Sequence, residues 1–276
     1  MNLIRWIRLP YSLRLFFQIV KYKFLARIEY PGSFAAGIVT QWIAYGVEML
    51  ILFLMVWNFG SLVGWLPAEI IFMYAAWLLS YAIGASFVFN IVINLHRMAI
   101  DGAMDEALTR PMRPLAYLIA AHYNLGYISH VLITVAALAW SIGQLGLAQY
   151  WTALHWLWLV IMIIAGAVIN GCMMLICEMP ALRLRSQSPV RALFWESWTM
   201  MRYPITIYPR PLQFVFTVVL PYGFVSFYPM QVLLGRTDGL LPGVTMWLSP
   251  FVAILLIGIT GICWRKVSAG YESAGT

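Results

Sequence analysis

The stretch WTALHWLWLVIMIIAGAVINGCMMLICE (Trp151–Glu178) carries no Asp, Lys or Arg, and its only Glu is the last residue. Because a helix needs about 20 mainly apolar residues to cross a bilayer, this stretch predicts a membrane span. The whole chain agrees, with 276 residues of which 63% are hydrophobic and 10% charged. A soluble domain has about 45–50% apolar and about 25% charged residues. The composition therefore excludes an ordinary soluble domain and predicts an all-α polytopic membrane protein.

Six segments in total are long and apolar enough to span. They are expected at residues 34–58, 68–94, 115–142, 151–178, 211–228 and 244–264. Residues 1–32 are expected to form a cytoplasmic N-terminal interface segment, and residues 33–276 a single six-span domain. The segment Met230–Leu241 is apolar but too short to cross, so it predicts a re-entrant or interfacial segment between the fifth and sixth spans.

The distribution of Lys and Arg predicts the orientation. Of the 17 basic residues, all except Arg236 fall on the side of the expected spans that holds both termini. By the positive-inside rule, both termini are expected in the cytoplasm. Topology and contact with anionic lipid headgroups then explain the net charge of +7, and no nucleic-acid-binding signature accompanies it. The basic residues before residue 33 interrupt any apolar core there, so no cleavable signal peptide is expected.

Residues Leu13–Ile28 predict a helix at the cytoplasmic surface, ended by Pro31-Gly32. The predicted helix has two apolar flanks, whereas a helix lying on a membrane has one apolar and one polar face. Two interpretations stay open: a general amphipathic anchor, or a helix wedged between lipid and protein.

The segment between the second and third spans, His96–Pro111, is short and charged. It predicts one or two helical turns that are stopped by the prolines of Arg110-Pro111-Met112-Arg113-Pro114. A rigid charged projection just outside the membrane suits a cytosolic partner; the alternative is a solvated connector.

The segment Pro180–Arg210 is the longest between spans and is expected on the cytoplasmic side. Its aromatic residues and arginines are typical of interfacial anchors, although their density exceeds what anchoring needs. Farther along, Pro221 is expected to kink the fifth span.

Several polar side chains fall within the expected spans, where a charged residue costs roughly 2.5 kcal/mol or more. Glu48 is near the middle of the first span and shares a stripe with Gln41. The other candidates are Asn90, Asn94, His122, His130 and Asn170. These stripes either pack helices together through small and polar residues or line part of a substrate route. His122 and His130 are also candidates for a proton relay or a pH sensor, and Glu48 for contact with a cationic substrate.

The chain resembles the ABC-2 type permease family in three motifs. They are YPITIYPR (203–210), VLPYGFVSFYP (219–229) and Gly102-x-x-Asp105-x-x-Leu108-x-Arg110-Pro111. The residues that carry the first two are Tyr203, Pro204, Tyr208, Pro209, Pro221, Gly223 and Pro229. Within the family, the chain is most similar to the branch of bacterial permeases that pair with a second permease and a separate ATPase.

The resemblance implies a non-catalytic membrane subunit of an ATP-driven exporter in the bacterial inner membrane. A dimer of cytosolic ABC ATPases would dock beside the N-terminal helix and on the coupling loop. The coupling-loop residues would be Gly102, Asp105, Glu106, Leu108, Arg110 and Pro111. The second permease would be a paralogue rather than an identical copy, and ATP with Mg²⁺ would bind only in the ATPase. The segment after the fifth span would be re-entrant.

The sequence itself supports one part of this expectation. The chain has no Gly-x-x-x-x-Gly-Lys-[Ser/Thr] motif and therefore cannot bind ATP through a P-loop. Two alternatives use Glu48, His122 and His130: a proton-driven secondary transporter and an intramembrane enzyme. The sequence shows neither a convincing internal repeat nor a nucleophile motif. Cys172 and Cys177 do not have zinc-site spacing, so no metal is expected.

Overall fold

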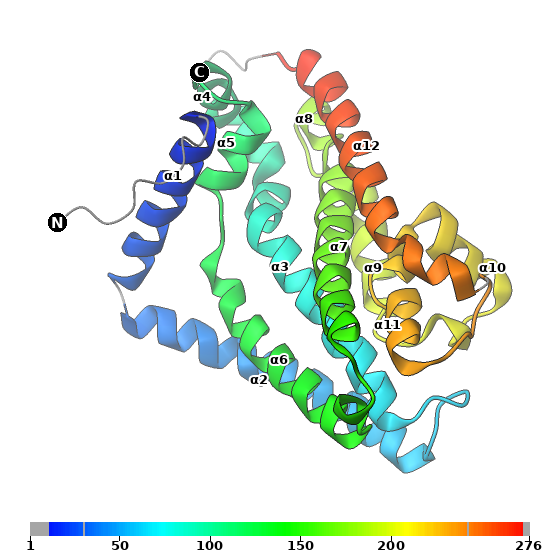
Figure 1. Cartoon of the computed structure of the whole chain (residues 1–276). Helices are drawn as coiled ribbons and strands as arrows, with labels where there is room; N and C mark the ends of the chain where they lie inside the picture. Colours follow the sequence, from blue (N-terminus) through cyan, green and yellow to red (C-terminus); the bar gives the residue numbers. More distant parts are fainter. Residues whose placement is uncertain (1–10, 30, 242, 273–276) are drawn as a thin grey trace.

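The computed structural model describes residues 11–29, 31–241 and 243–272, and this part of the chain is helical throughout, without β-strands (Figure 1). The α-helices are α1 (Tyr11–Ile28), α2 (Pro31–Phe59), α3 (Pro67–Ile100), α4 (Ala103–Thr109), α5 (Pro114–Ala121), α6 (Ile128–Gln144), α7 (Ala153–Glu178), α8 (Ala181–Leu184), α9 (Val190–Met200), α10 (Arg210–Phe214), α11 (Phe227–Leu234) and α12 (Ser249–Ala269). The all-α prediction is confirmed.

Five segments are long and apolar enough to cross a membrane. They are Ala35–Asn58, Pro67–Ile100, Leu125–Gln144, Ala153–Leu184 and Ser249–Ala269. A sixth candidate is a bent helix pair, Arg210–Val219 with Pro221–Leu234. The last span begins later than residue 244, because a 3-10 helix, Gly243–Leu248, precedes Ser249.

Helices α3 and α7 form the centre of the molecule and pack against each other (Figure 1). Small residues allow their backbones to approach closely. A Cβ atom on Gly84 of α3 would lie 2.4 Å from the carbonyl oxygen of Ala167 on α7. On the same helix, Gly166 packs against Ser80 of α3. Helix α6 packs on α3, and α12 packs on α7.

The third span is not the continuous helix expected over 115–142. Helix α5 ends at Ala121, and the chain resumes as a short 3-10 helix, Leu125–Tyr127, before α6. Asparagine side chains replace the helical hydrogen bonds at the break: Asn90 donates to the His122 carbonyl at 3.1 Å, and Asn124 accepts from the Gly126 amide at 2.9 Å. Such local side-chain bonds compete with helix formation.

The fifth span is not a single helix over 211–228 either. A π-helix, Val215–Val219, follows α10, and the chain then turns by 70° before the 3-10 helix Pro221–Phe224 and α11. The predicted kink at Pro221 is confirmed. We call residues 210–234 the bent pair.

Both ends of the bent pair lie near the start of α3. On the approach to the pair, Thr206 accepts a hydrogen bond from the Trp65 indole at 3.0 Å. Just after the pair, Arg236 forms a salt bridge with Glu69 and lies 4.1 Å from the centre of the Trp65 ring.

The segment Pro180–Arg210 is not a surface loop, because α9 packs inside the bundle. The Trp198 ring lies 4.5 Å from Trp77 and 4.6 Å from Tyr81, both on α3, measured between ring centres. Trp195 contacts Phe89, one turn or more nearer the end of α3. These contacts show that α9 runs antiparallel to α3, so the tryptophans are packing residues as well as aromatic anchors.

Candidate functional site

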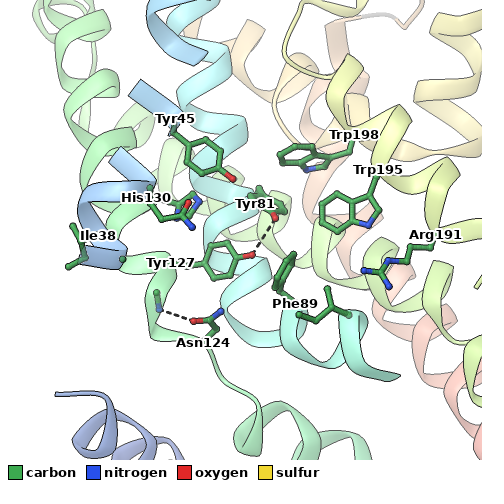
Figure 2. A pocket seen from close by; sticks show the side chains of 14 residues that line it. Ile38, Tyr45, Tyr81, Phe89, Asn124, Tyr127, His130, Arg191, Trp195 and Trp198 are labelled. Carbon is green, nitrogen blue, oxygen red and sulfur yellow. Dashed lines mark hydrogen bonds between the residues drawn. The ribbon is translucent and has the colours of Figure 1, made fainter. Parts of the chain in front are cut away.

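A cavity of about 410 Å³ lies between α2, α3, the break before α6, and α9. We call it the aromatic cavity. Its lining residues are Gly37, Ile38, Gln41, Tyr45, Tyr81, Phe89, Ile93, Asn124, Gly126, Tyr127, His130, Arg191, Trp195 and Trp198. Figure 2 shows Tyr45, Tyr127 and His130 on one side and the α9 side chains on the other. Of the polar candidates from the sequence, Gln41 and His130 line it.

Ring contacts fix the cavity walls. The His130 ring lies between those of Tyr45 and Tyr127, at 4.2 and 4.9 Å between centres. The hydroxyl groups of Tyr81 and Tyr127 are 3.4 Å apart, so that α3 and the α6 break share a hydrogen bond (Figure 2). A wall built from packed rings holds its shape at little cost in conformational entropy.

Three polar groups of the wall keep hydrogen-bonding capacity unused within the described chain. They are His130 Nε2, the Trp198 indole nitrogen and Arg191 Nη1, all buried atoms. Both His130 and Trp198 are buried residues, at 3% and 6% exposure. Buried polar atoms without partners are uncommon, because each costs about 1–3 kcal/mol.

The only cation of the wall, Arg191, has one carboxylate neighbour. Its Nε atom lies 4.0 Å from Glu178, a residue that is fully buried at the end of α7. No carboxylate of the described chain lines the cavity itself.

A second cavity, of about 300 Å³, lies at the break between α5 and α6. It is lined by Lys23, Ala26, Asn90, Ala121, His122, Tyr123, Asn124 and Leu125. Burial lowers the pKa of His122, and the nearby Lys23 lowers it further. His122 therefore lines a different cavity from His130, and the helix is interrupted between them.

Glu48 lies outside both cavities and is engaged by two groups. Its carboxylate accepts a hydrogen bond from the Tyr74 hydroxyl at 3.1 Å and forms a salt bridge with Arg202 at 3.2 Å. The structure thus joins α2, α3 and the segment after α9 through one carboxylate. His130 and His122 line separate cavities, and Glu48 lines neither of them.

The remaining polar candidates have structural surroundings. Asn94 donates to the Asn90 carbonyl one turn earlier, at 2.9 Å. Asn170 is fully buried in α7, and its side-chain amide finds no partner in the described part of the chain. In that part, no cluster of three or more His, Cys, Asp or Glu residues could hold a metal ion.

The coupling-loop residues form α4 and its flanks at the far end of α3. The chain turns from α3 into α4 at Gly102, whose φ of 74° favours glycine. Met104 and Ala107 are fully buried and anchor the helix, while Leu108, at the border of this buried side, is 47% exposed. The expected short helix before Pro111 is confirmed.

The charged side chains of α4 have partners. Glu106 accepts hydrogen bonds from Arg110 at 2.5 Å and from the Tyr117 hydroxyl at 2.8 Å. These bonds, Arg110 first, lower the pKa of the Glu106 carboxyl. Asp105 lies 3.4 Å from the Tyr271 hydroxyl, beyond the end of α12. These contacts tie α4 to α5 and to the segment after α12.

The motif residues of 203–229 organise the bent pair. The Tyr208 hydroxyl donates to the Met200 carbonyl at 2.6 Å, and Pro209 precedes the first residue of α10. A Cβ on Gly223 would lie 2.7 Å from the Tyr228 ring, so glycine is required there. Tyr203 and Pro204 line a small cleft beside the pair, and Pro229 is buried in α11.

The helical bundle with several candidate spans defines a multi-pass membrane protein. Comparison with protein families shows that residues 42–275 match an ABC-2 family transporter protein. The chain therefore belongs to the ABC-2 transporter family and is a permease-type membrane component. No curated protein matches it, nor does any solved structure.

Sequence reasoning missed several residues of the aromatic cavity. Tyr45, Tyr81 and Tyr127 lie on three separate segments, and no spacing along the chain shows that they converge. For Arg202 there was a signal: an acid at mid-span, Glu48, requires a counter-ion from another segment.

Proposed function

We propose that the chain is the permease subunit of an ATP-driven exporter that is powered by a separate cytosolic ABC ATPase. The observation that carries the proposal is α4, a short helix beyond the end of α3 with a buried anchoring side and an exposed side. The chain has no P-loop, so ATP and Mg²⁺ would bind in the ATPase dimer. Permeases of the ABC-2 family are generally non-catalytic membrane components, which supports ATP hydrolysis in a separate subunit.

The docking surface that we propose is the exposed side of α4. Leu108 would be its apolar contact, since a large exposed apolar side chain outside a membrane suits a protein interface. Asp105, Glu106 and Arg110 would hold the helix rigid through their contacts within the chain. Gly102 and Pro111 would set its limits.

A second permease would cover α2. In an apolar 18-residue stretch of the candidate span Ala35–Asn58 only 6% of the residues are buried, which leaves most of this helix for lipid or a neighbouring subunit. The resemblance favours a paralogue over an identical copy. Anionic lipids would meet the basic end of the molecule, and the bacterial inner membrane is the location that we propose.

We further propose that both termini are cytoplasmic and that residues 190–207 make the fifth crossing. Support comes from contacts at both ends: Arg191 lies by Glu178 at the end of α7, and Thr206 by Trp65 at the start of α3. The bent pair would then be re-entrant from the outer side. The basic residues would divide as fourteen inside against Arg210 and Arg236 outside, with Arg202 inside the bundle, so the charge bias persists.

Cysteine labelling tests this topology in a background in which the three native cysteines are replaced by serine. In intact spheroplasts, a membrane-impermeant maleimide is expected to label Arg210→Cys and not Gln187→Cys. If Arg210→Cys is labelled only after lysis, residue 210 lies on the cytoplasmic side and the proposed topology is wrong.

The docking proposal is tested by purifying the tagged chain from its native host in mild detergent and photolabelling with an azido-ATP analogue. We expect a labelled ATPase to co-purify and Leu108→Glu to reduce its recovery about tenfold or more, because a charge would be buried in the interface. Leu184→Glu is the matched control, since Leu184 is 54% exposed on α8, near the same end of the bundle (Figure 1). If no nucleotide-binding subunit accompanies the wild type, the proton-driven alternative replaces this proposal.

A further inference from the structure

We propose that the aromatic cavity binds a planar aromatic compound that carries an anionic group such as a carboxylate. The inference deepens the proposed function, because it names the class of compound that the permease would accept. The cavity itself, with its rings and its donors, carries the argument.

The size and walls of the cavity suit an aromatic ligand. Its volume of about 410 Å³ falls within the range of about 300–1,000 Å³ that small-molecule sites occupy. Tyr45 lies on one side of it and Trp195 and Trp198 on the other (Figure 2). Aromatic side chains on both sides offer ring contacts to an aromatic ligand and less to a flexible aliphatic chain.

The polar groups of the cavity select an acceptor. His130, Trp198 and Arg191 each have a buried nitrogen without a hydrogen-bond partner in the described chain. The indole and guanidinium nitrogens can only donate hydrogen bonds, and a guanidinium forms its strongest bonds with oxyanions. A ligand oxyanion in the cavity would lie beside the guanidinium of Arg191, which lines the cavity and whose side chain is 21% exposed.

The charges disfavour a cation, although aromatic walls alone could attract one. No carboxylate of the described chain lines the cavity, and its one cation, Arg191, would repel a second positive charge. The acid that the sequence offered to a cationic substrate, Glu48, is already paired with Arg202. Glu178 lies 4.0 Å from Nε of Arg191, beyond hydrogen-bond distance, and the Arg191 side chain is 21% exposed, so the guanidinium keeps donors for a ligand.

Equilibrium dialysis with the full chain in nanodiscs tests the inference without any ATPase. Three radiolabelled probes share one ring system: 2-naphthoate, 2-naphthol and 2-naphthyltrimethylammonium, each corrected with empty nanodiscs. We expect 2-naphthoate to bind at least about tenfold more tightly than the other two, because only it forms a charge-assisted bond with Arg191.

The decisive variant is Arg191→Gln combined with Glu178→Gln, which removes the cation without leaving a buried acid unpaired. It is expected to lose the preference for 2-naphthoate, while Glu178→Gln alone keeps or increases it. Trp195→Leu is expected to weaken all three probes and keep their order. Size-exclusion profiles and melting temperatures verify that each variant is folded.

Equal or tighter binding of the ammonium probe, or an unchanged preference in the double variant, would overturn the inference. Its failure is separable from that of the proposed function. Loss of the ATPase in the co-purification leaves probe binding unaffected, and absence of probe binding leaves the ATPase contact intact.

Discussion

Helices α3 and α7 differ from α2 in what holds them in place. In an apolar 18-residue stretch of each candidate span, 72% of the residues are buried in α3 and in α7, against 6% in α2. The first two are joined by backbone contact at Gly84, whereas α2 is attached to the bundle largely through side chains. In a membrane, helices associate through close packing of small residues, because lipid tails solvate apolar side chains as well as another helix does. An apolar helix that lacks such packing therefore gains little free energy by exchanging lipid contacts for helix contacts.

The attachment of α2 depends on a few polar bonds. The Trp42 indole donates to the Ser129 carbonyl at 3.0 Å, and Glu48 binds Tyr74 and Arg202. We infer that α3 and α7 form a fixed frame through close packing. Helix α2, which is one wall of the aromatic cavity, is packed less closely and can separate from this frame more easily. Three substitutions test it, in decreasing order of expected effect.

The largest effect is expected for Gly84→Ala, which inserts a methyl group 2.4 Å from the Ala167 carbonyl oxygen. Backbone atoms cannot yield, so we expect a destabilisation of about 3 kcal/mol or more and loss of folded protein on size exclusion. Gly258→Ala on α12 is the control, because nothing lies within 4 Å of its Cβ position. A folded Gly84→Ala protein of normal melting temperature would refute the fixed frame.

A smaller effect is expected for Arg202→Gln, which leaves the carboxylate of Glu48 with one donor. Both side chains are about one-third exposed, at 29% and 34%, so the loss is moderate. We expect about 1–3 kcal/mol, measured by thermal unfolding in detergent. Because Glu48→Gln with Arg202→Gln leaves no unpaired charge, the double variant should be more stable than either single one; strict additivity would mean that the two residues do not interact.

The smallest effect is expected for Glu106→Gln on α4, which is held by the end of α3. Because the pKa of Glu106 is lowered by Arg110 and Tyr117, its stabilisation is present above the unfolded-state pKa and disappears as pH falls through the folded pKa. Wild type and variant should therefore differ slightly near neutral pH and converge in acid. The difference is small because the ion pair is exposed and salt screens it. A difference that grows toward acid pH would contradict this role.

The sequence predicts α3, α7 and the confirmed kink at Pro221 well, because long apolar runs and proline act locally. The interruption after α5 was not predicted, because asparagine and histidine also occur within continuous spans. The side chain of Asn90, which donates to the His122 carbonyl at the break, lies on another helix, α3. Helix α9 has 11 residues, too few to be recognised as a span by hydropathy.

The candidate site was predicted in part. Local signals located α4, where Gly102 and Pro111 bound a short charged segment. The aromatic cavity depends on residues that converge from α2, α3, α6 and α9, and one sequence does not specify that convergence. Counting basic residues did not predict the salt bridge of Arg202 with Glu48, because the count considers only the segment in which each arginine lies.

The end of α12 is tied to the same place as α4. Tyr271 contacts both the Ala99 carbonyl and Asp105 at 3.4 Å, and Arg183 on α8 donates to the Lys266 carbonyl at 2.8 Å. Helix α4 thus lies beside the ends of both α3 and α12, two helices that pack on α7 from either side (Figure 1). A displacement of α4 would therefore act on both α3 and α12. It would reach the far end of α3 without involving α2.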